Sequence, residues 1–350
     1  MESRKYSVAE IVFEVILEEP WRFLGITPAV QKRIDSASRG EKIGIEPCRA
    51  GDAVPARTFI KSKDELPEGM TRFDLNFTQY EPFRTEESNP AFTLKVCAQE
   101  PSWIEESKLD GSTRLVMSVE EQMPRYFIYR NGNRTLFEFE AAVGNVVCSL
   151  LIDEDATTGE LFPKGSRNAG AIQYQLCTAL MVMFTYKAAT RGTLLMHSSV
   201  IRHDGMANMF LGTSGTGKST HSRLWLENIE GCDLVNDDNP AIKISEDGKN
   251  ATVYGTPWSG KTPCYRNISV PLRSIVRLSQ APQNSIKDIS GLEAFITIIS
   301  SASAIRWDRK VMDGITKTAE KVANCTRCCQ MGCLPDADAA FTCLNHIEKR

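Results

Sequence analysis

The chain has 350 residues, of which 42% are hydrophobic and 24% charged, and its formal net charge is −3. This composition is ordinary for a globular chain of about two domains and excludes a disordered or fibrous protein. A nucleic-acid-binding protein normally carries a basic surface, so the slight excess of acidic residues predicts no nucleic-acid partner.

The sequence predicts neither a secretory signal nor a membrane span. Its charged N-terminus leads into a strand-like segment, 11–17, that contains Glu14, and no stretch approaches the run of about 18 apolar residues that a membrane helix needs. Without a secretory signal, the 11 cysteines are better explained as reduced thiols than as disulfides. We therefore expect a cytoplasmic protein with no membrane partner.

Residues 1–160 are predicted to form a β-rich N-terminal domain. Apolar and polar residues alternate over 11–17, as they do along a half-buried strand. Two further strand-like runs, 125–129 and 135–139, flank the turn sequence Asn131-Gly132-Asn133 and predict a β-hairpin. No catalytic motif occurs here, and the role of this domain stays open.

The boundary between domains is placed near residue 160, in the polar, glycine-containing stretch 153–166. Residues 161–350 then form the second domain. It should open with a helix over 171–189, where apolar residues recur at the spacing of one broad helical face.

The strongest chemical signal is the phosphate-loop pattern G-x-x-x-x-G-K-[ST], matched by Gly212-Thr213-Ser214-Gly215-Thr216-Gly217-Lys218-Ser219. An apolar strand over 206–211 enters the loop and a helix over 219–228 leaves it, as the motif requires. Backbone N–H groups and the helix N-terminus would face a polyphosphate. Lys218 would add a positive charge, and the Ser219 hydroxyl would bind Mg²⁺.

A histidine precedes the loop closely. Residues 194–201 and 206–211 should form a hairpin through the turn Asp204-Gly205, which delivers His197 close to the phosphate loop. A lone histidine is more often a hydrogen-bonded core residue than a ligand, but the neighbouring loop favours a functional role.

Paired carboxylates end the next predicted strand, 232–238. Phosphoryl transfer needs acids both to hold Mg²⁺ and to accept the proton of the attacking hydroxyl, and Asp237 and Asp238 could divide these tasks. Side chains alternate along a strand, so a bend at Asn239-Pro240 is required to direct both towards one site. The alternative is that the pair caps a turn before Pro240.

Strand-like segments 241–244 and 251–254 follow where a doubly wound fold would have a crossover helix, so we expect a mixed or largely antiparallel sheet. The Gly/Pro-rich loop 255–262 comes next. This loop could gate an acceptor site, with Lys261 offsetting phosphate charge in the transition state; the alternative is a surface turn with Trp258 packed inward.

Together these motifs resemble the nucleotide domain shared by the ATP-dependent phosphoenolpyruvate carboxykinases and the bacterial HPr kinase/phosphorylases. The resemblance covers about 194–262 and rests on four stretches: Met196-His197-Ser198-Ser199, the loop Gly212 to Thr220, Leu234-Val235-Asn236-Asp237-Asp238 and Gly260-Lys261. It implies an α/β fold with a mixed sheet, a phosphoenolpyruvate-carboxykinase-like phosphate-loop kinase domain that binds Mg-ATP.

The resemblance also implies residue roles. In carboxykinases the matching histidine and second aspartate bind a metal, which carries over to His197 and Asp238 and adds Mn²⁺ to Mg²⁺ as a candidate ion. In HPr kinases the first aspartate acts on the acceptor's proton, which carries over to Asp237. Lys261 looks like the lysine that follows the second hairpin in carboxykinases.

The chain departs from both families. No Lys or Glu occurs in 171–186, where a carboxykinase would supply a further metal ligand, and the HPr-kinase stretch Glu-Ile-Arg-Gly-Leu-Gly is absent. Neither oxaloacetate decarboxylation nor a phosphocarrier-protein substrate therefore carries over. The chain looks like a divergent member, similar to the kinase-like proteins found beside peptide-modification systems.

The C-terminal region is expected to support the site. Arg273 and Arg277 share one face of a strand over 271–278, either within reach of phosphate or, as we favour, in solvent. Four cysteines contain one C-x-x-C spacing but not a second, which favours a buried strand over a zinc site: Cys325, Cys328, Cys329 and Cys333.

From the sequence we expect a kinase that transfers the γ-phosphate of ATP to a hydroxyl group of an unidentified small molecule, peptide or protein. Two alternatives stay open: a carboxykinase-type enzyme and a non-catalytic ATP sensor. The oligomeric state is also open, a homo-oligomer included.

Overall fold

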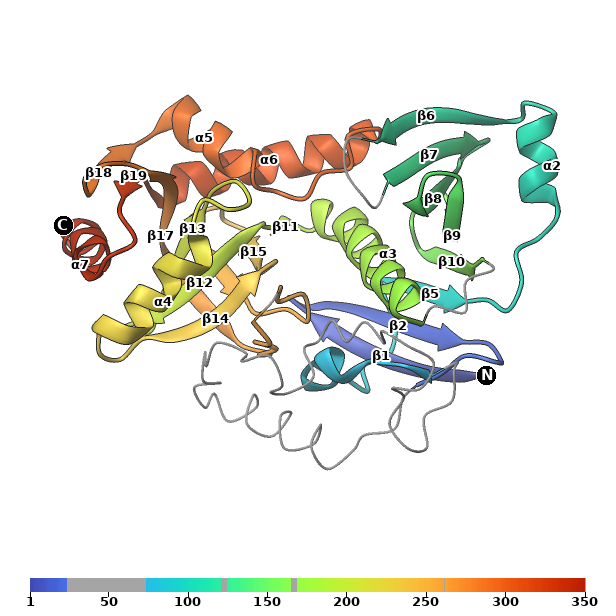
Figure 1. Cartoon of the computed structure of the whole chain (residues 1–350), viewed down its shortest axis with the longest axis horizontal. Coiled ribbons are helices and arrows are strands. Elements are labelled where there is room, and N and C mark those ends of the chain that lie inside the picture. The colour runs from blue at the N-terminus through green and yellow to red at the C-terminus, as the bar shows by residue number, and fades with distance from the viewer. Residues whose placement is uncertain (24–73, 121–124, 165–168, 261, 350) are drawn as a thin grey trace. The chain divides into compact units, whose positions relative to one another are not determined.

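The computed structural model describes residues 1–23, 74–120, 125–164, 169–260 and 262–349. These residues form two compact units, which are divided in the chain between Lys187 and Ala188 (Figure 1). Each unit is built on a mixed β-sheet with helices beside it, so the α/β fold class with mixed sheets is confirmed.

The first unit contains an eight-stranded sheet in which the expected hairpin is formed by β7 and β8. Gly132 takes a positive φ of 58° at its turn, a conformation that glycine adopts readily. In order across the sheet the strands are β1 (Glu2–Val8), β2 (Ile11–Leu17), β5 (Phe92–Val96), β10 (Thr158–Pro163), β9 (Asn145–Ile152), β8 (Arg134–Ala142), β7 (Arg125–Asn131) and β6 (Thr113–Val119). The smaller elements are β3 (Arg22–Phe23), β4 (Asp74–Leu75), the 3₁₀ helix η1 (Thr78–Phe83) and α2 (Trp103–Leu109).

The long helix α3 (Ala169–Ala189) belongs almost entirely to the first unit. A Cβ atom at Gly159 of β10 would lie 3.1 Å from Met183 of α3, so helix and strand pack closely. The division by contacts therefore follows α3, whereas the sequence placed the boundary near residue 160, before this helix. Among the described helices, α3 included, none has the length and apolarity needed to cross a bilayer.

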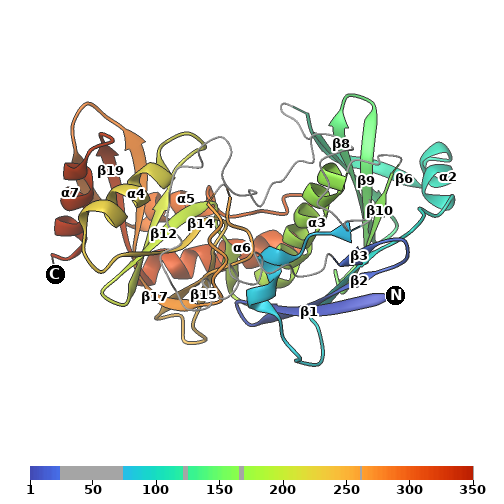
Figure 2. The ribbon, with the colours of Figure 1, turned by 60° about the horizontal axis from the view of Figure 1, so that its bottom comes forward.

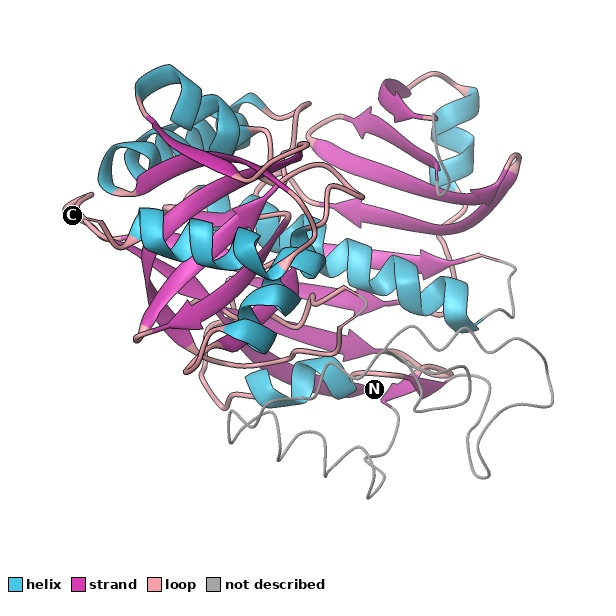
Figure 3. Ribbon diagram, turned by 60° about the vertical axis from the view of Figure 1, so that its left-hand side comes forward, coloured by secondary structure: helices cyan, strands magenta, loops and turns pink. Residues whose placement is uncertain are grey.

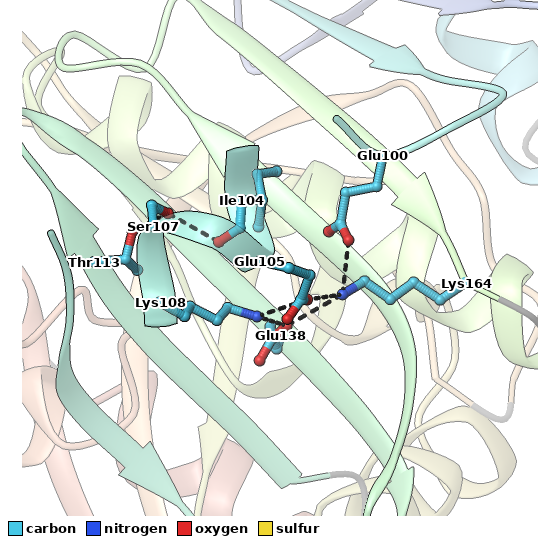
Figure 4. A network of polar contacts seen from close by, with 8 residues as sticks. All are labelled: Glu100, Ile104, Glu105, Ser107, Lys108, Thr113, Glu138 and Lys164. Carbon is cyan, nitrogen blue, oxygen red and sulfur yellow. Dashed lines mark hydrogen bonds and ion pairs between the residues drawn. The ribbon is translucent and has the colours of Figure 1, made fainter. Parts of the chain in front are cut away.

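A network of charged side chains ties α2 to the sheet of the first unit (Figure 4). Lys108 Nζ lies 2.5 Å from Glu138 Oε1 and 3.1 Å from Glu105 Oε1. Lys164 Nζ pairs with the same two carboxylates and with Glu100 at 2.9 Å. Because Glu138 is buried, its charge needs these partners, and the network fixes α2 over β8.

The second unit is built on a nine-stranded sheet. Strands β13, β17 and β19 run parallel, and β14 shares their direction because β12 lies antiparallel to both β13 and β14. The order is β11 (Thr193–Leu195), β15 (Ala241–Ile244), β16 (Ala251–Tyr254), β17 (Ser269–Gln280), β13 (Met206–Leu211), β12 (Ser198–His203) and β14 (Asp233–Asp238), with β19 (Arg327–Cys333) paired to β17 and β18 (Ser285–Ile289) paired to β19. The hairpin β15–β16 replaces a crossover helix, as expected.

Helices α4 (Lys218–Asn228) and α7 (Ala337–Ile347) lie side by side in Figures 1 and 2 and share one apolar core with the sheet. Trp225 and Phe210 are fully buried in that core. Helices α5 (Gly291–Ile299) and α6 (Arg309–Cys325) contact each other, and α6 also contacts β11 and β15. Figure 3 shows these helices beside the strands of the unit. The sheet is thus held by a core that also fixes the helix following the phosphate loop.

His221 in this core makes the stability of the fold depend on pH. Its Nε2 accepts a hydrogen bond from Trp225 Nε1 at 3.1 Å, and burial lowers the pKa of His221 from 6.5 to about 4. Between about pH 4 and pH 6.5, His221 therefore binds a proton in the unfolded chain and does not bind one in the folded protein. We expect the free energy of unfolding to fall on the order of 2 kcal/mol between pH 7 and pH 5.

Urea denaturation at the two pH values measures this loss. His221→Gln is the matched control, because glutamine still offers Trp225 an acceptor and does not titrate. The variant should lose less stability than wild type over the same range, and equal losses would contradict the assignment.

Candidate functional site

The phosphate loop is shaped by glycines. Gly212, Gly215 and Gly217 have φ angles of 157°, 82° and 108°, a region that other residues rarely adopt. A Cβ atom at Gly212 would also lie 3.1 Å from the side chain of Thr216. The loop therefore needs glycine at these positions to turn from β13 directly into α4, whose first residue is Lys218.

Internal hydrogen bonds hold the loop while its outer surface stays open to solvent. Thr216 Oγ1 donates to Thr213 O at 2.6 Å, and Lys218 Nζ donates to Gly212 O at 2.8 Å. Ser214 and Ser219 are exposed. A backbone concavity at a helix N-terminus suits a polyphosphate, since both the N–H groups and the helix dipole favour negative charge.

His197 lies between β11 and β12 and joins the loop to an aspartate. Its Nε2 lies 3.1 Å from Lys218 Nζ and its Nδ1 lies 3.1 Å from Asp238 Oδ1. An ammonium group has only donors, so Nε2 accepts from Lys218 and Nδ1 carries the hydrogen that it donates to Asp238. The predicted proximity of His197, Lys218 and Asp238 is present in the structure.

The strand that carries both aspartates turns at its end through Asn236. The Oδ1 of this buried side chain accepts hydrogen bonds from the backbone N–H groups of Asp238 and Asn239, both at 3.0 Å. Its Nδ2 donates to Thr256 O at 3.2 Å and so ties the turn to the next loop. Asn236 thus forms the bend that we expected at Asn239-Pro240, where the strand has to turn if both aspartates are to face one site.

The loop after β16 fixes Asp237. Asp237 Oδ2 accepts a hydrogen bond from Thr262 Oγ1 at 2.7 Å, and Asp237 N donates to Ser259 Oγ at 3.3 Å. The other oxygen, Oδ1, is buried and has no hydrogen-bond partner among the described residues. An unpaired buried carboxylate oxygen costs free energy, so this atom is suited to a proton donor or a cation supplied by a ligand.

The same loop contacts Asp238. A Cβ atom at Gly260 would lie 3.1 Å from the side chain of Asp238, so any other residue here would push that side chain by a few tenths of an ångström. Burial lowers the pKa of Lys218, while the charges of Asp238 and Asp237 act in the opposite direction. Both carboxylates therefore act on the lysine of the phosphate loop.

These side chains fit a divalent cation. Mg²⁺ and Mn²⁺ prefer oxygen ligands, and Mn²⁺ also accepts imidazole. Asp238 offers carboxylate oxygens, His197 its Nε2 once the hydrogen bond from Lys218 is given up, and Ser219 an exposed hydroxyl in the first turn of α4. The buried, unpaired Oδ1 of Asp237 is the observation that most favours a positive charge here.

Other residues in and just after the Gly/Pro-rich loop have structural partners. Arg266 is buried, donates to Leu234 O at 2.6 Å and pairs with Asp233 at 3.0 Å. Trp258 is packed inward, as the alternative interpretation proposed. Lys261 lies outside the described residues, so its predicted role stays a prediction.

The C-terminal cysteines are not gathered into one metal site. Their thiols contact separate partners: Val322 O for Cys325, Thr326 O for Cys328, Asp288 Oδ1 for Cys329 and Ser279 O for Cys333. The predicted strand is present as β19, which carries Cys328, Cys329 and Cys333, and successive side chains on it point to opposite faces.

A cleft opens on the other side of the phosphate loop. It has a volume of about 480 Å³ and is lined by Gly212–Thr216, Arg277–Gln280 and Gln330. We call it the β17–β19 cleft, after the two strands that contribute Arg277–Gln280 and Gln330 to its lining. Arg273 was predicted to share a strand face with Arg277, but it does not line the cleft and pairs with Glu348 at 3.1 Å. The two arginines thus differ in their surroundings.

Sequence reasoning missed three residues of the site: Asn236, Ser259 and Thr262. No role was predicted for these polar residues, although Asn236 lies in the quoted stretch 234–238, because each acts through a partner at least 20 positions away or through a backbone group. The available signal was the concentration of hydroxyl residues in the Gly/Pro-rich loop 255–262.

Fold and loop together define a mixed α/β domain built around a phosphate-loop sequence, with a histidine, a lysine and two aspartates at one end of the loop. A family model described as "SynChlorMet cassette protein ScmC" matches residues 164–333, which include all of these side chains.

Among solved structures, the chain is similar to one described as the Hpr(Ser) kinase/phosphatase from Coxiella burnetii. The two are 12% identical with a TM-score of 0.25, and the match covers 43% of this chain and 95% of that chain. No curated protein sequence matches the chain.

Proposed function

We propose that the protein is an Mg-ATP-dependent phosphotransferase that moves the γ-phosphate of ATP to a hydroxyl group of a small molecule, peptide or protein. The observation that carries this proposal is the group formed by Lys218, His197 and Asp238, with Asp237 beside it, at one end of the phosphate loop. A phosphate loop alone would support only nucleotide binding, whereas the paired acids suit phosphoryl transfer.

In this proposal, the loop N–H groups and Lys218 bind the phosphates of ATP. Ser219 and Asp238 would hold Mg²⁺, with His197 as a further ligand or as the side chain that orients Asp238. The ion supplies positive charge that offsets the charge developing on the phosphate oxygens. The hydrogen bond from His197 Nδ1 fixes the Asp238 carboxylate, as partners of metal ligands commonly do.

Asp237 would act as the general base. As the acceptor oxygen forms its bond to the γ-phosphorus, the bond from phosphorus to the bridging oxygen breaks, and ADP leaves with those electrons. The proton of the acceptor hydroxyl passes to Asp237, whose Oδ1 has no hydrogen-bond partner among the described residues. The product is a phosphate ester of the acceptor.

Thr262 is a positioning residue in this scheme, because its hydrogen bond holds one oxygen of Asp237 and leaves the other unpaired. Thr262→Val keeps the shape of the side chain and removes the donor. We expect kcat to fall about 10-fold, the size expected from losing one hydrogen bond to a charged group, with the KM for ATP unchanged.

Thr262→Ser is the matched variant, since it retains the hydroxyl and should recover most of the lost kcat. Steady-state turnover of ATP measures both variants. If the valine variant changed KM as much as kcat, or if serine gave no recovery, Thr262 would have only a structural role.

Transfer of labelled γ-phosphate into fractionated small molecules, peptides and proteins tests the proposed function. A labelled product that forms with wild type and not with Asp237→Asn would establish a kinase and identify its class of acceptor. Tight ATP binding by both proteins without a labelled product would instead support a nucleotide sensor. Product formation only from oxaloacetate would support the carboxykinase alternative.

A cytoplasmic location belongs to the same proposal, because ATP is abundant there and thiols stay reduced. The structure describes 10 cysteines, all of them free, which agrees with a reducing compartment.

A further inference from the structure

We propose that the β17–β19 cleft binds the nucleoside part of the nucleotide, with Arg277 against the base and Gln330 at its polar edge. This inference rests on the proposed function, since it assigns the position of the base for a nucleotide whose phosphates lie on the loop.

The register of the sheet gives the first argument. Asp238 on β14, Ser198 on β12 and Leu211 on β13 are register partners, and the same row continues through Arg277 on β17 to Gln330 on β19. Register partners lie on one face of a sheet. With about 4.8 Å between neighbouring strands, the row runs roughly 19 Å from Asp238 to Gln330.

The phosphate loop follows Leu211, at the centre of this row. On one side lie the acids and His197, which suit the terminal phosphate and its metal ion. The nucleoside is attached to the opposite end of the triphosphate, so it must leave the loop on the other side. Arg277 and Gln330 occupy that side.

The size and chemistry of the cleft agree with a nucleoside. Its volume of about 480 Å³ lies within the range of roughly 300–1,000 Å³ that is usual for small-molecule sites. None of its lining residues carries a carboxylate, and among the described residues no acid pairs with Arg277. The exposed guanidinium is therefore available to stack on a flat base.

The remaining polar groups can select the base. Gln330 is half-buried and offers both a donor and an acceptor, which is what hydrogen bonding to the edge of a base requires. Gln280 Nε2 lies 3.5 Å from Gly215 O and joins the wall of the cleft to the phosphate loop. The cleft is thus continuous with the phosphate site.

Equilibrium binding of Mg-ATP, Mg-GTP and Mg-tripolyphosphate tests the inference, because tripolyphosphate has the phosphates without the nucleoside. We expect wild type to bind ATP more tightly than tripolyphosphate. Arg277→Ala should weaken ATP binding roughly 3- to 30-fold and tripolyphosphate binding much less. Gln330→Ala should change the ratio of the affinities for ATP and GTP by about 2- to 10-fold.

Arg273→Ala is the matched control: it removes the same charge from the same strand, at a residue that does not line the cleft. Equal wild-type affinities for ATP and tripolyphosphate, or equal effects of the two arginine variants, would overturn the inference while leaving the phosphate site intact. Unchanged ATP affinity with impaired transfer would assign the cleft to the acceptor instead. Failure of wild type to bind either polyphosphate would reject the proposed function itself.

Discussion

Replacing Lys218 by alanine is expected to weaken Mg-ATP binding roughly 10- to 150-fold, the loss of a hydrogen-bonded charge facing phosphate. In the structure Lys218 Nζ lies between the loop carbonyl of Gly212 and the ring of His197, at the start of α4. No other lysine or arginine belongs to the loop sequence, so no neighbouring side chain within it can replace the charge. Isothermal titration with Mg-ATP measures the effect.

The control for this variant is Arg223→Ala, which removes a positive charge from the exposed face of the same helix. Arg223 lies 3.7 Å from Glu227 one turn along α4, an interaction of little consequence at an exposed site. Its loss should leave ATP affinity within about twofold of wild type. Similar losses in the two variants would show that general electrostatic attraction, and not Lys218 itself, governs binding.

Asp237→Asn should lower turnover by about 10²- to 10⁴-fold while ATP affinity stays nearly unchanged, because it removes the base and keeps the shape of the side chain. The amide oxygen can still accept the hydrogen bond from Thr262, so the loop should keep its conformation. Single-turnover transfer of labelled phosphate, measured beside ATP titration, separates the two quantities.

Asp247→Asn provides the comparison, since Asp247 is an exposed acid in the β15–β16 turn that accepts hydrogen bonds from Ser245 Oγ and Lys249 N of the same turn. It should change neither quantity. If Asp237→Asn weakened ATP binding as strongly as Lys218→Ala, the division between a binding lysine and a catalytic aspartate would be wrong.

Local sequence patterns predicted many of the described helices and strands in both units. Alternation located the strands, the turn residues Asn131 to Asn133 located a hairpin, and the glycines of the phosphate loop located the turn into α4. These signals are local because strand pleating, helix periodicity and positive φ angles are set by neighbouring residues. The mixed α/β class followed from the order of these elements.

The contacts that position the aspartates and form the cleft are tertiary, and the sequence pattern did not predict them. The bend at Asp238 depends on the buried amide of Asn236 and its bond to Thr256, and Asp237 is fixed by Thr262, 25 positions away. Arg277 and Gln330 become neighbours only through the register of β17 with β19. Contacts of this kind leave no periodic signal, so single-sequence reasoning could name the aspartates but not what holds them.

The position of the boundary between the two units also depends on tertiary contacts. Helix α3 is apolar on much of its surface, and nothing local indicates which sheet it covers. Its packing against Gly159 through Met183 assigns it to the first unit, and the break in contacts falls after Lys187. A boundary placed by loop composition alone therefore came before the helix.

The single row from Asp238 to Gln330 has a consequence for product release. Its ends lie on strands of one hydrogen-bonded sheet, so the distance between them is fixed. In the proposed arrangement a nucleoside triphosphate extends from the cleft to the aspartates, whereas a diphosphate held by the same base stops short of them. After transfer, ADP would keep its contacts in the cleft and lose those beside Asp238, so the sheet would discriminate substrate from product by the length of the phosphate chain.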